Sequence, residues 1–242
     1  MYKSSKVKKP IAEKQIEIEG ISILLLQKRI RNLHLRILPP LGEVRVSAPV
    51  RLSLVQIKKF VTQRLDWIRA KQIEVRARKI IAPPKFISGE IHDLFGEKFE
   101  LRVVENSKSN SVVIDENFLE LRAKKTTTIL QRKKILDDFY RVNLAEKIPA
   151  LAEKYEEKMG KKVAEFRIKK MTTRWGTCNV RARRIWLSLE LAKKPIECLE
   201  MIVVHEMTHL FERGHNKKFY ALMDHFFPQW KLWDAKLKHK IC

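Results

Sequence analysis

The sequence predicts an α+β fold, and three observations lead to this prediction. Apolar and polar residues alternate in the short segments between Gln15 and Val50, as they do in half-buried strands. Apolar residues recur at helical spacing after Ser53 and again after Thr127. Hydrophobic residues make up 45% of the 242 residues, which is enough for a sizeable core. We expect a basic flexible tail at residues 1–14, a β-rich N-terminal lobe with helices at 15–125, and a separate C-terminal region at 126–242.

The N-terminal lobe is expected to begin with an antiparallel β-meander. Four short β-rich segments, separated by glycine and proline residues typical of turns, lie at 16–20, 21–28, 33–39 and 43–49. Ser53 is a suitable N-cap for a helix that runs to about Lys79 and packs its apolar face on the sheet. Pro83 and Pro84 end that element, and further strands are expected at 98–104 and 111–121.

The C-terminal region is expected to begin with a long helix from about Thr127 to Met159. Pro149 should kink or break this helix, because proline has no amide hydrogen to donate. Two strands, at 166–170 and 184–189, flank the segment MTTRWGTCNVRA. Pro195 then opens a second helix at the first-turn position that proline favours.

The chain carries a large excess of positive charge. Its 51 lysines and arginines against 28 acids give a formal net charge of +23. Such a surface favours anionic partners and permits nonspecific contact with nucleic acid through phosphate groups. A lysine-rich surface that is merely solvated explains the charge equally well. The charge therefore indicates a class of partner and not a function.

Cysteine usage and the N-terminus indicate a cytoplasmic protein that contacts no membrane. Cys178, Cys198 and Cys242 are odd in number and form no C-x-x-C pair, so neither a disulfide framework nor a cysteine-based zinc site is indicated. The basic N-terminus is followed by no hydrophobic signal segment. The longest apolar run, residues 21–26, is too short to span a bilayer.

The helix that Pro195 opens carries the motif with the most chemical content. Residues 205–209 read His-Glu-Met-Thr-His, the H-E-x-x-H pattern. Residues four apart on a helix project from the same face, so His205 and His209 can both reach one zinc ion. Glu206 points in a different direction, and its carboxylate can act as the general base on a water bound to that metal. The sequence therefore predicts a Zn²⁺-dependent hydrolase, although another divalent metal remains open.

A catalytic zinc ion needs a third protein ligand, and His215 is the preferred candidate over Glu212. A turn at Gly214 can bring His215 back towards the metal, whereas Glu212 lies about two turns along the helix from His205. Glu212 is then a surface carboxylate or one that orients an imidazole. His225 is a weaker candidate and Cys198 is expected to be a packed core residue. No motif surrounds His34, His92 or His239.

A basic stretch precedes the metal-binding helix. Between Phe166 and Leu189 there are seven cationic residues and no acid. If these strands border the site, they present positive charge to a substrate or stabilise an oxyanion. A cationic sheet face with solvated side chains is an equal alternative. Arg174 and Trp175 are the candidates for substrate binding within this stretch.

Several segments together resemble the YgjP-type family of metallopeptidase-like, metal-dependent hydrolases. They are Arg174–Cys178, Trp186–Leu189, Pro195, Val203–His209, Gly214–Asn216, Phe219, Pro228 and Trp230, and they extend to Asp66–Ile68 near the N-terminus. The resemblance implies an α+β fold with a C-terminal zincin-like core, metal ligands at His205, His209 and His215, and a catalytic Glu206. The chain departs from the family pattern at Thr177 and Ser188, which bears on substrate positioning and not on the metal site.

Three functions follow from these features. The first is a cytoplasmic zinc metallopeptidase in which Glu206 is base and proton shuttle. The second is a metal-dependent hydrolase of an anionic small molecule, such as a pyrophosphatase acting on a nucleoside triphosphate. The third is a nucleic-acid-associated protein whose metal site is ancillary. The sequence does not indicate an oligomeric state.

Overall fold

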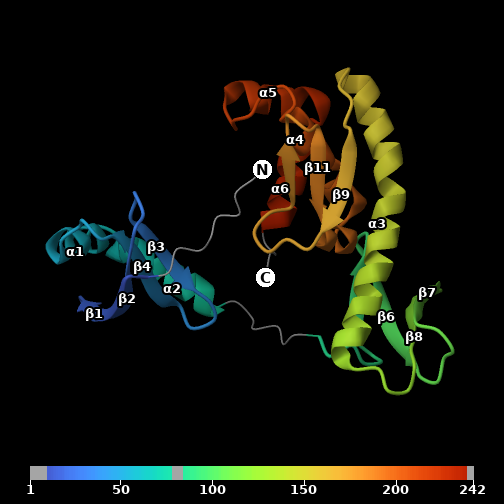
Figure 1. The fold of residues 1–242 in the computed structure, drawn as a ribbon, viewed down its shortest axis with the longest axis horizontal. Helices are drawn as coiled ribbons and strands as arrows, with labels where there is room; N and C mark the ends of the chain where they lie inside the picture. Colours follow the sequence, from blue (N-terminus) through green and yellow to red (C-terminus); the bar gives the residue numbers. More distant parts are fainter. Residues whose placement is uncertain (1–9, 78–83, 239–242) are drawn as a thin grey trace. The chain divides into compact units, whose positions relative to one another are not determined.

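The computed structural model describes residues 10–77 and 84–238 (Figure 1). The chain divides into two compact units, Met1–Pro83 and Pro84–Cys242. The described part is an α+β fold, as the sequence predicted. Of the tail expected at residues 1–14, residues 1–9 lie outside the described part, and Ala12 already begins the first strand.

The first unit contains a four-stranded sheet with the order β1-β2-β4-β3. Its strands are β1 (Ala12–Ile18), β2 (Ile21–Lys28), β3 (His34–Leu38) and β4 (Glu43–Pro49). The expected meander is wrong, because β4 lies parallel to β2 and separates it from β3. Burial explains the order: β4 buries Val44, Val46 and Ala48 completely or nearly so, whereas β3 has no buried residue and forms an edge.

Two helices, α1 (Leu54–Thr62) and α2 (Leu65–Ala77), replace the single helix expected at 53–79. Ser53 caps α1 as predicted, since its side chain accepts a hydrogen bond from the Gln56 amide. The break at 63–64 lets both helices contribute buried residues, including Ile57 of α1 and Ile68 of α2, to the core over the sheet.

The second unit begins with a sheet of the same topology. Its strands are β5 (Ile91–Leu94), β6 (Glu97–Val104), β7 (Ser111–Asp115) and β8 (Phe118–Arg122), in the order β5-β6-β8-β7. The central pair β6 and β8 is again parallel, and the outer pairs are antiparallel. No internal repeat is evident in the sequence, so this repetition is visible only in the strand pairing.

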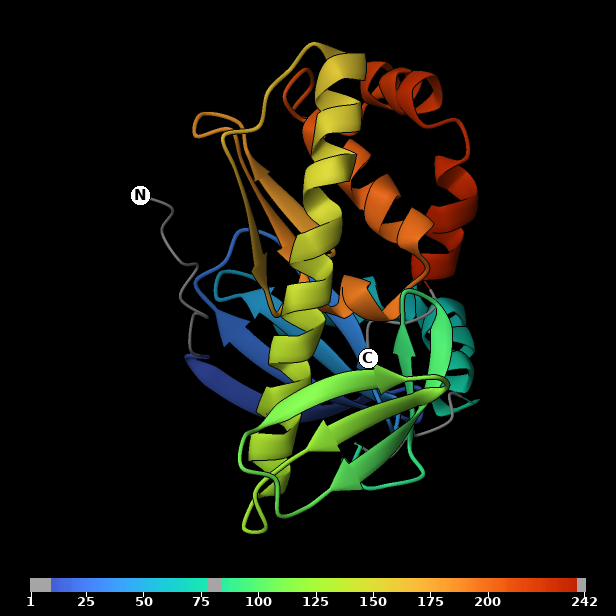
Figure 2. The same cartoon turned by 90° about the vertical axis from the view of Figure 1, so that its right-hand side faces the viewer.

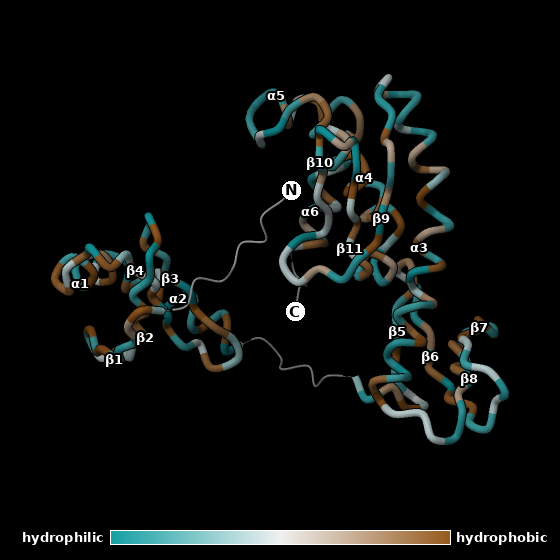
Figure 3. Tube along the Cα trace, viewed as in Figure 1, coloured by the Kyte–Doolittle hydropathy of each residue, from teal (hydrophilic) through white to brown (hydrophobic). Residues whose placement is uncertain are grey.

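A long helix, α3 (Ile129–Met159), connects this sheet to the rest of the unit (Figure 2). The helix is not broken at Pro149, because Leu144, Ile148 and Tyr155 are buried on both sides of the proline and hold the helix in place. Hydrophobic and hydrophilic residues are interleaved along it (Figure 3). Sheet β5–β8 shares one hydrophobic core with α3, and both belong to the unit that begins at Pro84.

The remaining elements carry the site. A three-stranded sheet has the order β10-β11-β9, with β9 (Glu165–Lys169), β10 (Gly176–Asn179) and β11 (Arg184–Ser188). The sequence predicted β9 and β11 but not β10, which is an edge strand of four residues. A short 3₁₀ helix (Leu189–Lys193) leads into α4 (Ile196–Thr208), which α5 (Lys217–Phe226) and α6 (Trp230–Lys238) follow. Among the described residues, no helix is long and apolar enough to cross a bilayer.

Candidate metal centre

Helix α4 supplies four of the five residues of the H-E-x-x-H motif and ends within it. Its last residue is Thr208, and His209 is the C-cap residue, so the helix ends before the turn at Gly214 that the sequence predicted. Tight turns follow, in which the Leu210 amide bonds to the Met207 carbonyl. The chain then turns back to Asn216, whose side chain caps α5 by accepting from the Phe219 amide.

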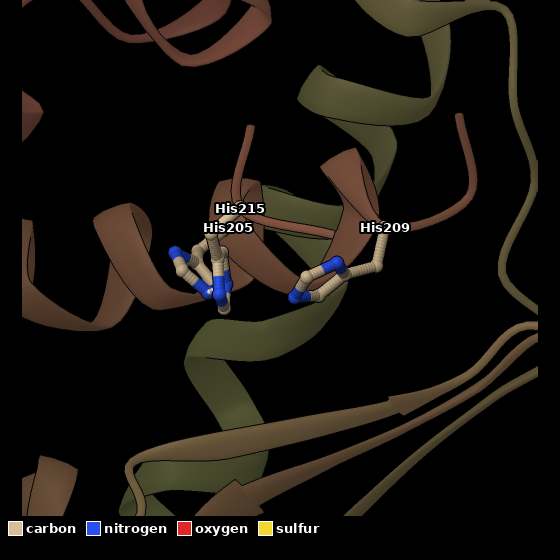
Figure 4. A group of neighbouring side chains, drawn as sticks. All are labelled: His205, His209 and His215. Carbon is tan, nitrogen blue, oxygen red and sulfur yellow. Dashed lines mark hydrogen bonds between the residues drawn. The ribbon is translucent and has the colours of Figure 1, made fainter. Parts of the chain in front are cut away.

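This turn brings three imidazoles together (Figure 4). One ring nitrogen each of His205, His209 and His215 lies within 4.8 Å of the other two. The Nε2 atoms of His205 and His215 are 3.0 Å apart. Four ligands around a zinc ion at about 2.0–2.1 Å from each nitrogen require ligand separations of this order. The structure thus brings together the three histidines that the sequence selected, and their side chains fit one metal ion.

The ring of His209 is held by the backbone of the loop. Its Nδ1 atom lies 3.1 Å from the carbonyl oxygen of Glu212, which favours a proton on Nδ1 and leaves Nε2 free to bind a metal. Glu212 therefore orients an imidazole, as one prediction had it, but through its main chain. Its carboxylate accepts a hydrogen bond from the Gly214 amide and is not in the group of three.

Aromatic side chains surround the three imidazoles. Phe219 is fully buried, and its ring centroid lies 4.7–4.9 Å from the centroid of each imidazole. Tyr220 stacks on His215 at 6.4 Å on one side and on Trp230 at 5.3 Å on the other. The indole Nε1–H of Trp230 donates to Asp224 at 2.8 Å. Sequence reasoning did not assign a role to these residues, although the family resemblance included Phe219 and Trp230.

The surroundings of His205 and His209 favour the neutral imidazole, which is the state that binds a metal. Burial, followed by repulsion from His209 and His215, lowers the pKa of His205 to about 4. Burial also lowers the pKa of His209. A set of three imidazoles would suit zinc or another first-row divalent metal.

Glu206 is buried beside β10, with 4% of its surface exposed. A Cβ atom on Gly176 would lie 2.7 Å from both Cγ and Oε1 of Glu206, so only glycine leaves room for this side chain. The Cys178 amide donates a hydrogen bond to the carboxylate. Burial raises the pKa of Glu206 to about 8, although the positive charge of Arg174 and the Cys178 amide act in the opposite direction.

The cationic side chains of the basic stretch at 166–189 make contacts in several different places. Arg174 is exposed and acts electrostatically on Glu206, so it lies near the candidate site. Trp175 is half-buried; its carbonyl accepts from the Ser188 amide and its ring lies under Lys194. The other contacts lie elsewhere: Arg167 and Lys169 over Trp186, Arg184 with Glu165, and Lys170 with Asp137. Most of the stretch is therefore a cationic sheet face.

The weaker candidates lie outside the group of three histidines. His225 is exposed on α5, with its ring against Phe226. Cys198 is fully buried in the core, as predicted. His92 is buried and lies 3.5 Å from Glu90, and His34 is exposed on β3. His239 lies outside the described residues.

Comparison with known proteins assigns the chain to a family. The family described as YgjP-like, metallopeptidase domain matches residues 31–240. A segment of 36 residues is 56% identical to a UTP pyrophosphatase from Escherichia coli (strain K12), which amounts to 15% of this chain and 22% of that protein. No solved structure matches. Because the family match covers most of the sequence and indicates a metal-dependent hydrolase, the chain belongs to the YgjP-like family.

Proposed function

We propose that the protein is a hydrolase that uses zinc, or another divalent metal, held by His205, His209 and His215, with Glu206 as the general base. The observation that carries this proposal is the convergence of three imidazoles near a buried carboxylate, Glu206, which is the neighbour of His205 on α4.

A metal held by His205, His209 and His215 would supply Lewis-acid chemistry: it would lower the pKa of water and polarise the carbonyl or phosphoryl oxygen of the substrate. Glu206 takes the proton from the attacking water and returns it to the leaving group. Its pKa of about 8 makes it a stronger base than an exposed glutamate, and a nearby dication favours its ionised form. The Cys178 amide and the space at Gly176 fix the carboxylate in one place.

Two substrate classes are compatible with this machinery, and we place a nucleoside triphosphate first. The charged side chain that acts on Glu206 is Arg174, a cation that suits a phosphoanhydride and its leaving group. The short match to a UTP pyrophosphatase supports the same class, although it covers only 22% of that protein. The sequence alone placed a peptidase first, and the charge at the site changes that order.

A peptide is the second candidate, favoured by a specific observation on β10. This strand is the edge of its sheet, and the Cys178 amide on it points to Glu206 and not to β11. An extended peptide can add to such an edge and place its carbonyl near the metal. The family description as a metallopeptidase domain agrees with this alternative.

The proposal is tested with Glu206→Gln and a panel of substrates. We expect Glu206→Gln to retain a full equivalent of metal and to lose turnover by about 100-fold to 10,000-fold, the usual range for a general base. Glu197→Gln, on the same helix about 13 Å away by helical rise, is the matched carboxylate control. His225→Ala is the matched control for His215→Ala, which should lose metal.

Nucleoside triphosphates and unstructured peptides are then offered to the metal-loaded protein. Release of pyrophosphate or phosphate that depends on Glu206 supports the first substrate class, and Glu206-dependent peptide cleavage supports the second. Full turnover by Glu206→Gln, or a metal content that does not change in His205→Ala, contradicts the proposal. Tight binding of nucleic acid with no turnover of either class favours the third function.

A further inference from the structure

A second potential site lies next to the metal centre, where α3 ends and the β10–β11 turn begins. A surface pocket of about 360 Å³ is lined by Gly160, Lys161, Lys162, Val180, Arg183 and Leu210. Three of these residues are cations and none is an acid. The volume falls in the range of about 300–1,000 Å³ that is typical of small-molecule sites.

The three cations come from two different elements. Lys161 and Lys162 follow Gly160, the left-handed C-cap of α3, where they also compensate the negative end of the helix dipole. Arg183 belongs to the β10–β11 turn, where its amide bonds to the Val180 carbonyl and its φ of 44° is left-handed. The helix dipole of α3 accounts for the position of the two lysines. It does not account for Arg183, which lines the same pocket from the β10–β11 turn.

No acidic residue lines the pocket in the described part of the chain. Glu156, near the end of α3, accepts a hydrogen bond from the Val163 amide. The ammonium group of Lys161 lies 5.3 Å from the ring of Phe211, which holds this side chain at one side of the pocket. Arg184, next to Arg183, pairs with Glu165, whereas Arg183 faces the pocket.

The chain connects this pocket directly to the metal centre. Leu210, in its wall, follows His209, and Val180 lies two residues after Cys178, whose amide binds Glu206. Two residues of an extended strand span about 7 Å. The backbone segments that line the pocket therefore continue directly into the segments that carry His209 and the Cys178 amide.

We propose that the Lys161–Lys162–Arg183 pocket binds a phosphate-bearing small anion. Arginine offers a planar fork of donors and the lysines offer point charges, a combination that suits phosphate oxygens. The assignment of the pocket to part of a substrate rests on the proposed function, but binding in the pocket does not, since it is measured without turnover.

The test measures the affinity of inorganic pyrophosphate by calorimetry on the metal-loaded protein. Lys161→Ala/Lys162→Ala removes two charges from the pocket, and Arg183→Asn removes the third while keeping a residue that tolerates a left-handed backbone. The matched control is Lys124→Ala/Lys125→Ala, another exposed lysine pair just before α3, whose 31 residues span about 46 Å. Thermal unfolding of each variant confirms that it is folded.

We expect each pocket variant to bind pyrophosphate at least about tenfold more weakly, which corresponds to the loss of about 1.4 kcal/mol of binding free energy. The control pair should change the affinity by less than about twofold, because exposed charges at that distance are screened. An equal loss in pocket and control pairs, or no loss in either, overturns the proposal. A loss of affinity for duplex DNA without a loss for pyrophosphate also overturns it, because the ligand is then nucleic acid. Turnover that fails while pyrophosphate binding stays pocket-dependent contradicts only the proposed function.

Discussion

The two halves of the candidate metal centre are held in place by different interactions. His205 and Glu206 lie on α4, where nine residues are buried, and Glu206 itself is 4% exposed. His215 lies in the loop between α4 and α5, and its side chain is exposed. Core packing fixes the helical half. A hydrogen bond to a carbonyl, a helix cap and stacked aromatic rings fix the loop half.

This difference indicates where the site can tolerate change. The helical half has no free space, since a single methyl group at Gly176 would overlap Glu206. The loop half has space, because a Cβ atom at Gly214 meets nothing within 4 Å. We therefore expect substitutions around α4 to affect catalysis strongly and substitutions around the loop to affect metal affinity more mildly.

The largest effect is expected from Gly176→Ala. The new Cβ atom forces the Glu206 carboxylate to move, and a displacement of about 1 Å costs on the order of 100-fold in turnover. Metal content should stay at the wild-type level, because the three imidazoles are not displaced. Gly214→Ala is the matched control and should keep turnover within about twofold. Steady-state kinetics and metal analysis measure both variants, and equal turnover in the two would show that α4 is not tightly packed.

A smaller effect is expected from pH on the metal-free protein. Burial raises the pKa of Glu206 from 4.5 to about 8, so the folded state holds a proton that the unfolded chain releases at lower pH. Stability from this group is full below pH 4.5 and is lost as the pH rises through 8. Between pH 6.5 and 8, above the ordinary pKa of the histidines, the free energy of unfolding should fall by on the order of 1.5 kcal/mol.

Glu206→Gln should abolish this loss, because glutamine does not titrate. Chemical denaturation at several pH values in the presence of a chelator provides the measurement. A wild-type decrease that persists unchanged in the glutamine variant would assign the pH dependence to another group and remove the evidence that Glu206 is desolvated.

The smallest effect is expected from the aromatic stack behind His215. Tyr220→Leu removes the ring between His215 and Trp230 and should weaken metal binding about fivefold, since such stacks contribute about 0.5–1.5 kcal/mol. Tyr220→Phe keeps the ring and should keep the affinity. In a His215→Ala background, Tyr220→Leu should have no further effect on the metal dissociation constant. The same loss in both backgrounds would mean that Tyr220 acts on the fold and not on His215.

Local sequence patterns predict much of the fold. The elements that they did not predict depend on other kinds of contact or are too short to show a pattern. Ser53 and Thr128 cap α1 and α3 through local hydrogen bonds, so those helix starts were predictable. The parallel pairing of β2 with β4, the strand β10 and the unbroken α3 were not. The pairing of β4 and the unbroken α3 depend on burial against residues far along the chain, whereas β10 is a four-residue strand too short to show an alternating pattern.

By itself the sequence determined the α+β class, the H-E-x-x-H motif and the preference for His215 over Glu212, because spacing along a helix and a glycine turn are local properties. Only the tertiary structure decided that Gly176 makes room for Glu206, that Phe219 packs against all three imidazoles, and that Arg183 joins two lysines at one pocket. These contacts join residues that are distant in sequence, and burial and electrostatics act on distances in space, which the folded chain alone defines.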